Sequence, residues 1–208
     1  MSIKSIQKKL LADLGEKLSV FGFNMKPKKQ SYYRPTNNGW DCVHISFIDH
    51  DSDFDVTLDI AIRFNDVENL VNSNNEMLTS KEKSETSTLG VEIGNLSMNE
   101  RLRWKVSSQE QLPTVIDSIL KEYKTSGEEY FSKYSSLESV HKLLSSDEKI
   151  VWKHCPFHAT RAKKAIAIAY LLGQSDIKDQ INHKKQFLED IKDFGLPSFL
   201  SFIEVLEQ

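Results

Sequence analysis

Apolar residues recur at two different periods along the chain, and the change of period predicts a sheet followed by helices. Apolar residues three and four positions apart over 3–21 predict an amphipathic helix that ends at Gly22. Alternation of apolar and polar residues over 54–64 predicts a long strand. Weaker alternation over 89–93 and 102–106 predicts two more. With two strands upstream, we expect an antiparallel sheet of about five strands carrying the N-terminal helix.

From Ser107 onward the apolar residues return to helical spacing, and Gly and Pro residues separate the helical stretches. We predict helices over about 107–123, 128–145, 156–173, 176–193 and 197–206. The predicted fold class is therefore α+β: an antiparallel sheet with an N-terminal helix, followed by a helical C-terminal half. We expect an α+β domain over 1–150 and a C-terminal helical extension packed on it over 151–208.

Composition and charge narrow the class of protein. In 208 residues, 39% are hydrophobic and 27% are charged, which suits a globular chain with a core. The net charge of −3 argues against coating of nucleic acid, because such binding needs excess cations. Two cysteines, Cys42 and Cys155, exclude a disulfide scaffold and favour a reducing compartment. Without a signal-peptide pattern or a run of ~20 apolar residues, we expect a cytoplasmic protein with no membrane partner. The sequence carries no convincing cofactor motif, so we expect no cofactor.

Several anchor residues follow one another in a set order over about 3–150. A helix runs into Gly22-Phe23, and a basic segment leads to a strand with Tyr33-Arg34 and then a hairpin. Leu89-Gly90 and Ile93-Gly94 mark a later strand, and Trp104 lies on a strand ahead of a helix. This order resembles a bacterial family catalogued as a domain of unknown function. The resemblance implies no catalytic residues. It implies small cytoplasmic proteins, with neutralisation of bacterial toxins as one role.

Metal binding is one alternative, at the segment from His154 to His158. Two histidines four positions apart and a cysteine can bind zinc when they share one face of a helix. Pro156 instead favours a helix that starts at that point, which would leave His154 and Cys155 outside it. We therefore predict a helix start without metal, and keep His154, Cys155 and His158 as the alternative ligands.

A catalytic alternative comes from the hairpin between 43–47 and 54–58. If the apolar residues of both strands share a face, His44 lies opposite Thr57 and Cys42 lies opposite Asp59. Cys42, His44 and Asp59 then share the polar face, where they could serve a hydrolase as nucleophile, base and acid. Such catalysis also needs a cleft and an oxyanion pocket, and the sequence indicates neither.

The polar face of the predicted sheet also carries charges of both signs. Alternation over 101–106 places Leu102, Trp104 and Val106 on the core side and their charged neighbours on the other. Complementary charge can select a partner and exclude wrong ones. We therefore predict a partner surface formed by Asp55, Asp59, Arg63, Arg101, Arg103 and Lys105.

Cations and aromatic rings alternate in the segment that follows Gly22, as in proteins that bind single-stranded nucleic acid. An acidic chain needs more than these six residues, so we do not expect nucleic acid to be the main partner. The residues are Lys26, Lys28, Lys29, Tyr32, Tyr33 and Arg34.

These observations favour a non-enzymatic protein-binding module, with toxin neutralisation as the role that the resemblance implies. A hydrolase or a metal-dependent enzyme ranks second, and a nucleic-acid accessory protein ranks third. The identity of the partner and the oligomeric state stay open.

Overall fold

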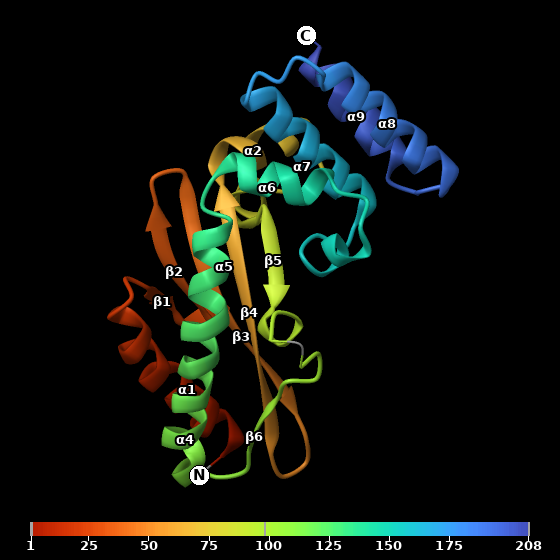
Figure 1. The fold of residues 1–208 in the computed structure, drawn as a ribbon. Helices are drawn as coiled ribbons and strands as arrows, with labels where there is room; N and C mark the ends of the chain where they lie inside the picture. The colour runs from red at the N-terminus through yellow and green to blue at the C-terminus, as the bar shows by residue number, and fades with distance from the viewer. Residues whose placement is uncertain (1, 98, 208) are drawn as a thin grey trace. The chain divides into compact units, whose positions relative to one another are not determined.

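The computed structural model describes residues 2–97 and 99–207, and its fold is α+β as predicted. An N-terminal helix, an antiparallel sheet and a helical C-terminal half follow one another along the chain (Figure 1). The chain divides into two compact units. Unit 1 comprises Met1–Ile62 and Gly90–Ser132, and unit 2 comprises Arg63–Leu89 and Lys133–Gln208.

This division differs from the predicted boundary at 150. The segment 63–89, expected in the first domain, belongs with the C-terminal helices. Within it, α2 (Asn65–Val71) packs against α7 (His158–Leu171). Val67 and Val71 of α2 are buried. The sequence could not show this grouping, because an apolar helix face does not indicate which distant element covers it.

Among the described residues, six strands form one sheet in the order β1-β2-β3-β4-β5, and β6 also pairs with β4. Antiparallel pairing places Tyr33 opposite Cys42 and Asp55 opposite Lys105. The strand predicted over 54–64 is present with those bounds. The strands are β1 (Asn24–Lys26), β2 (Ser31–Thr36), β3 (Gly39–Asp49), β4 (Phe54–Phe64), β5 (Leu89–Glu92) and β6 (Trp104–Val106).

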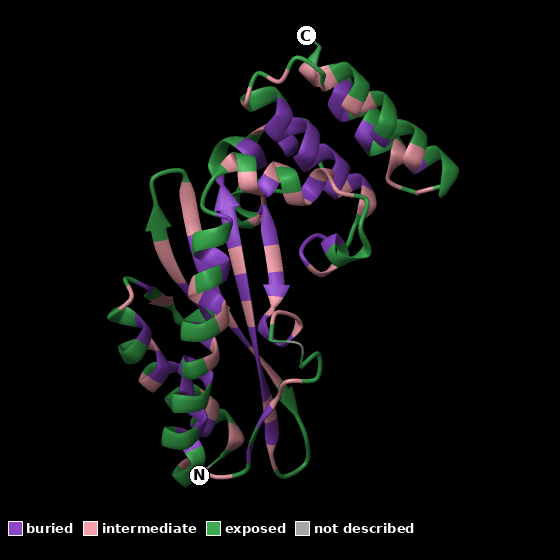
Figure 2. Ribbon diagram, viewed as in Figure 1, coloured by how far each residue is buried: buried purple, intermediate pink, exposed green. Residues whose placement is uncertain are grey.

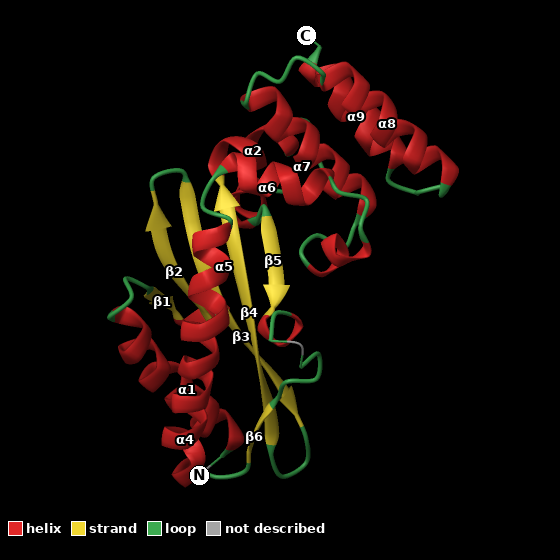
Figure 3. Cartoon of the chain, in the orientation of Figure 1, coloured by secondary structure: helices red, strands yellow, loops and turns green. Residues whose placement is uncertain are grey.

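In unit 1, α1 (Ile3–Ser19), α4 (Leu112–Glu122) and α5 (Glu128–Lys133) lie on one side of the sheet (Figure 3). The Tyr32 hydroxyl donates a hydrogen bond to the Leu11 carbonyl oxygen at 2.7 Å. Alternate strand residues such as Val43 and Ile45 are fully buried. The intervening residues therefore point to the opposite face of the sheet.

Unit 2 is built mainly of helices. They are α2, α3 (Ser80–Glu85), α6 (Leu137–Ser145), α7, α8 (Ile177–Asp190) and α9 (Leu196–Leu206). Figure 2 shows α7 buried along most of its length. Gly195 lies against Ala159, and Ser198 bonds to Lys163. The second contact lies further along the sequence than the first on both helices, so α9 runs beside α7 in the same direction.

Two predicted segments differ from the structure. The polar stretch 72–88, for which no helix is predicted, contains α3, which begins with a capping box between Thr79 and Glu82. The single helix expected over 128–145 is interrupted before Ser136, whose side chain caps the start of α6. Local capping chemistry decides both cases. Among the helices of the described residues, none has both the length and the apolar character needed to cross a bilayer.

Candidate functional site

The open face of the unit 1 sheet brings Cys42, His44 and Asp59 close together, in a different register from the predicted one. The backbone N–H of His50 donates to the Asp53 carbonyl oxygen at 2.9 Å, which closes the hairpin between β3 and β4. Counting back from this turn, His44 lies opposite Asp59, and Cys42 lies opposite Ala61. The prediction centred the turn one residue too early along the chain. The partner of each β3 residue on β4 therefore lies two residues further along than predicted, for example Asp59 in place of Thr57 opposite His44.

A serine that the sequence did not single out joins this group. Ser31 lies opposite His44, and its Oγ is 2.8 Å from His44 Nδ1. The Ser31 hydroxyl also donates to the Lys29 carbonyl oxygen at 2.8 Å. A hydroxyl has one proton, so His44 must be the donor in the first bond, and it cannot take the proton of Ser31. Only the pairing of β2 with β3 could have indicated this contact.

Burial raises the pKa of both the acid and the thiol on this face. Burial raises the pKa of Cys42 to about 11, so the thiol stays protonated near neutral pH. Burial is also the main cause of a raised pKa at Asp59, although His44 opposes it. A cysteine nucleophile needs a thiolate, and a base that activates it needs access to that proton. The trio is assembled, but its chemistry is not that of an activated nucleophile.

The charges predicted to form a partner surface on this face are largely paired within unit 1. Lys105 Nζ lies 3.0 Å from a carboxylate oxygen of Asp53. His50 Nε2 lies 3.3 Å from Asp55. Arg103 forms an ion pair with Glu92 of β5. Ion pairs therefore compensate three of the six predicted residues, Asp55, Arg103 and Lys105, which weakens the attraction of this face for a partner.

Arg63, also assigned to the partner surface, is only 4% exposed, so that assignment is wrong for this residue. Its Nη1 donates to the carbonyl oxygens of Lys83 at 3.1 Å and Thr86 at 2.5 Å. Its Nε donates to Asn65 Oδ1 at 2.9 Å. Alternation placed Arg63 correctly off the core face of β4, but the segment 83–86 covers it there. Arg63 therefore holds unit 2 together and does not meet a partner.

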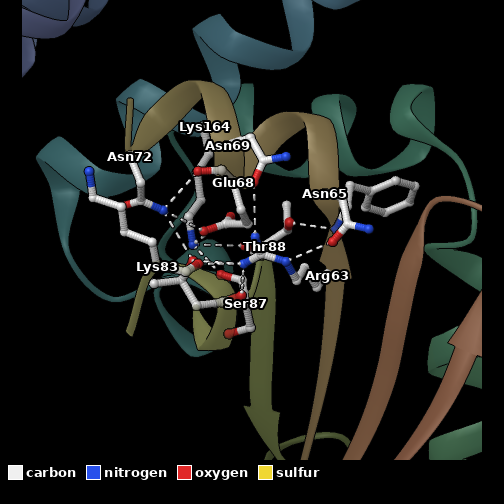
Figure 4. A network of polar contacts seen from close by, with 11 residues as sticks. Arg63, Asn65, Glu68, Asn69, Asn72, Lys83, Ser87, Thr88 and Lys164 are labelled. Atoms are coloured by element: carbon white, nitrogen blue, oxygen red, sulfur yellow. Dashed lines mark hydrogen bonds and ion pairs between the residues drawn. The ribbon is translucent and has the colours of Figure 1, made fainter. Parts of the chain in front are cut away.

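A second buried cation joins the same network in unit 2. Lys164 Nζ donates to the carbonyl oxygens of Ser87 at 2.5 Å and Thr88 at 3.2 Å. It also lies 3.5 Å from Glu68 Oε1, an oxygen without a hydrogen bond among the described residues. Figure 4 shows Arg63 and Lys164 both directed at the backbone near Thr88. The network ties α2, α7 and the segment 83–88 together, and within the described residues it contains an ion pair between Lys164 and Glu68.

Two more cations of α7 are buried without a carboxylate partner at hydrogen-bonding distance among the described residues. Lys163 Nζ lies 3.0 Å from the Ser198 Oγ. Arg161 Nη2 lies 2.8 Å from His158 Nδ1. Burial is the main cause of a lowered pKa at both Lys163 and Arg161. Since a guanidinium only donates, His158 must accept through a bare Nδ1, which keeps this histidine neutral.

The structure does not bring the alternative metal ligands together. His154 packs against the Tyr134 ring, at 5.8 Å between centroids, and burial lowers its pKa to about 4. His158 begins α7 and bonds to Arg161. Burial raises the pKa of the Cys155 thiol. Within residues 2–97 and 99–207, no group of three or more His, Cys, Asp or Glu side chains has an arrangement suited to a metal ion.

A cluster of exposed apolar side chains surrounds the start of α7. Of the exposed large apolar side chains among the described residues, all except Val20 and Ile48 lie in unit 2. Phe157 is 65% exposed and Phe194 is 89% exposed. We call the exposed rings at this end of α7 the aromatic surface, and it comprises Trp152, Phe157 and Phe194.

Packing beneath the aromatic surface holds its parts together. The His158 ring has edge contacts with Trp152 and Phe187, each at 5.4 Å between centroids. A Cβ added at Gly195 would lie 2.5 Å from the Ala159 Cβ, so only glycine lets the loop after α8 pass this closely. Periodicity could not indicate the surface, because its residues lie in loops and helix ends that the tertiary fold collects.

No protein-family model, curated protein or solved structure matches the chain. The resemblance of residues 3–150 to a bacterial family therefore stays a prediction that rests on the quoted anchors. Any proposal about function depends on the surfaces of the two units.

Proposed function

We propose that the chain is a non-enzymatic protein-binding module and that the aromatic surface is its contact site. The observation that carries the proposal is the gathering of Trp152, Phe157 and Phe194 at one end of unit 2, each exposed to water. Rigid aromatic side chains supply large contact area at little entropic cost, and they dominate the energetics of protein interfaces. Clusters of this kind mark interaction sites on soluble proteins.

The support beneath the surface also suits binding. The cluster rests on the first turn of α7, a helix buried along most of its length (Figure 2). His158 and Ala159 of that turn fix Trp152 and the loop at Gly195 from below. Such pre-ordered anchors lose less conformational entropy on binding than flexible ones.

Toxin neutralisation in a bacterial cytoplasm is the role we propose for this binding. It follows from the resemblance of residues 3–150, and a toxin-neutralising protein needs a binding surface and no catalytic site. Cys42 and Cys155 are both free and buried, which suits a reducing compartment.

The test uses Phe157→Ser with Phe194→Ser, because both side chains are exposed and contribute little to the core. Partners would be captured from host lysate by wild-type protein, identified by mass spectrometry, purified, and titrated against both forms by calorimetry. We expect affinity to fall about 1,000-fold, because each of the two lost anchors contributes about 2 kcal/mol. Val20→Ser, an exposed apolar position in unit 1 that is 82% exposed, is the matched control.

Three results would decide against the proposal. They are failure of wild-type protein to capture any protein, equal binding by the double variant, and equal loss with Val20→Ser. Light scattering of wild-type and variant proteins would identify the case in which the aromatic surface binds a second copy of this chain.

A hydrolase using Cys42, His44 and Asp59 is the second candidate, because β3 and β4 place the three residues on one face. The raised pKa of Cys42 weighs against it. Iodoacetamide labelling at pH 7 tests it directly. We expect Cys42 to react more slowly in the folded protein than in urea, and faster labelling would restore this candidate.

A further inference from the structure

The rings and cations after Gly22 are divided between the two faces of the sheet. Tyr32 is buried under α1, and Arg34 pairs with Asp41 and with Glu128 of α5. Tyr33 lies between them on β2 and therefore points to the open face. Of the six residues in the nucleic-acid-like segment, three therefore lie on the open face, namely Lys26, Lys29 and Tyr33. Lys28 lies in the adjoining turn.

The open-face residues form a compact group at the β1 edge of the sheet. Lys26 Nζ lies 5.0 Å and Lys29 Nζ lies 5.9 Å from the centre of the Tyr33 ring. The Trp40 ring meets Tyr33 edge-on, at 5.0 Å between centroids. Tyr33 and Trp40 are half-buried, so each retains exposed ring surface. We call this group, with the exposed Lys28, the lysine–aromatic edge.

The charge of the edge is not cancelled by its neighbours in sequence. No Asp or Glu occurs from Lys17 to Trp40. Asp49 and the acidic turn after it lie at the far end of β3. Lys26 is opposite Ser31, which is opposite His44, so Asp49 is five strand positions away along β3. At ~3.3 Å per residue and two strand spacings across, the separation is roughly 20 Å, or about two Debye lengths in physiological salt.

We propose that the lysine–aromatic edge binds single-stranded nucleic acid, with the lysine amines on phosphates and the rings of Tyr33 and Trp40 stacked on bases. The net charge of −3 argues against coating of nucleic acid but not against a local site separated from the acidic turn. Exposed cation–π contacts contribute only about 0.5–1 kcal/mol, so the exposed Lys26 can leave the Tyr33 ring for a phosphate.

Protection of an edge strand is the simpler role for these lysines, since lysine at a sheet edge opposes pairing with another chain. That role needs no aromatic rings beside the lysines, and it predicts no affinity for a polyanion. A nucleic-acid site needs both lysines and rings, because phosphate contacts and base stacking contribute separately to affinity.

The experiment measures fluorescence anisotropy of a labelled ten-nucleotide oligothymidine with the full chain, from 50 to 200 mM salt. Three phosphate contacts predict a log–log slope of about −2, a loss of affinity of about twentyfold over that range. Lys26→Ala with Lys28→Ala should reduce the slope to about −0.7, a loss of about threefold. Lys4→Ala with Lys8→Ala, exposed on α1, is the matched control and should keep the wild-type slope.

Trp40→Leu separates stacking from charge. It should lower the affinity about tenfold while leaving the salt slope unchanged. A polyglutamate peptide of equal charge should bind at least tenfold more weakly than the oligonucleotide, because it offers no bases. Thermal melting of each variant checks folding.

Absence of binding by wild-type protein at 50 mM salt would overturn the proposal. So would a salt slope unaffected by the double lysine change, or polyglutamate binding as tight as that of the oligonucleotide. This last result would indicate an acidic protein as the ligand. None of these outcomes depends on the aromatic surface of unit 2.

Discussion

Charged side chains of the same types occupy opposite surroundings in the two units. On the open sheet face of unit 1, Lys105 pairs with Asp53 at 3.0 Å, and the lysine side chain is 67% exposed. In unit 2, the side chains of Lys164 and Glu68 are 9% and 1% exposed, and their charged atoms lie 3.5 Å apart. The lysine of the first pair stays hydrated while its partner Asp53 is only 14% exposed, whereas the second pair has lost its hydration on both sides.

The difference shows which charges hold a structure together and which are replaceable. A buried charge needs every partner it has, so removal of one partner leaves the other unsatisfied. Exposed paired charges can be changed at little cost, but they attract a partner weakly. Neither group is an obvious contact site, which is why the proposed functions rest on exposed rings and on the lysine–aromatic edge.

The largest expected effect is from Glu68→Gln. The change removes the only carboxylate paired with Lys164 among the described residues and leaves a buried cation beside carbonyl oxygens alone. We expect the free energy of unfolding of unit 2 to fall by about 3–5 kcal/mol. Hydrogen exchange of peptides from 63–89 and 158–171 would measure it, with the exposed Glu204→Gln of α9 as control. A loss below ~1 kcal/mol would mean that the pair is not isolated from water.

Acid should weaken unit 2 through His154. Burial lowers its pKa from 6.5 to about 4. Between pH 6.5 and 4, His154 is therefore protonated in the unfolded chain and neutral in the folded chain. Stability should be level above pH 6.5 and fall between pH 6.5 and 4, by up to about 3 kcal/mol. His154→Phe, which keeps an aromatic ring, should flatten this part of the pH profile in hydrogen exchange. An unchanged profile would assign the acid sensitivity to another group, and His50→Gln in unit 1 is the control.

Lys163→Met should have a small effect in the opposite direction. Lys163 has a hydroxyl as its hydrogen-bonding partner and no carboxylate within ion-pair distance among the described residues. Replacing such a cation with an apolar side chain of similar length removes a desolvation cost, so we expect stability to stay level or rise by about 1 kcal/mol. Chemical denaturation would measure it. A loss above ~2 kcal/mol would show that the amine makes a stronger contact than its bond to Ser198.

The smallest effect is expected on the open sheet face. Arg103→Glu with Lys105→Glu breaks two pairs whose basic side chains are 31% and 67% exposed, and should lower stability only slightly. Binding of the partner captured through the aromatic surface should be unchanged in calorimetry. Loss of that partner with an unchanged melting temperature would return the contact site to the sheet face, as the sequence predicted.

Sequence patterns predicted the parts of this protein that depend on neighbours along the chain. The strand from Phe54 to Phe64 was found with its predicted bounds, because alternation over so many residues has one interpretation. The predicted α1 differs from the observed helix only at its C-terminal end. The class α+β followed from the change of period near 107. The helix starts at Ser136 and Thr79 were not predicted, although both residue types are common N-caps, because a single capping residue is a weak signal in the sequence.

Only the tertiary structure decided what surrounds each polar or aromatic side chain. Arg63 alternates off the core face like Asp59, yet the segment 83–86 covers it, and that contact spans 20 residues or more of chain. His44 meets Asp59 because one turn sets the register of two strands. The loop that carries Phe194 reaches the start of α7, where Phe157 lies, because Gly195 lets it pass close to Ala159. Local pattern determines which face a residue takes, whereas burial and partners depend on long-range packing that a period cannot encode.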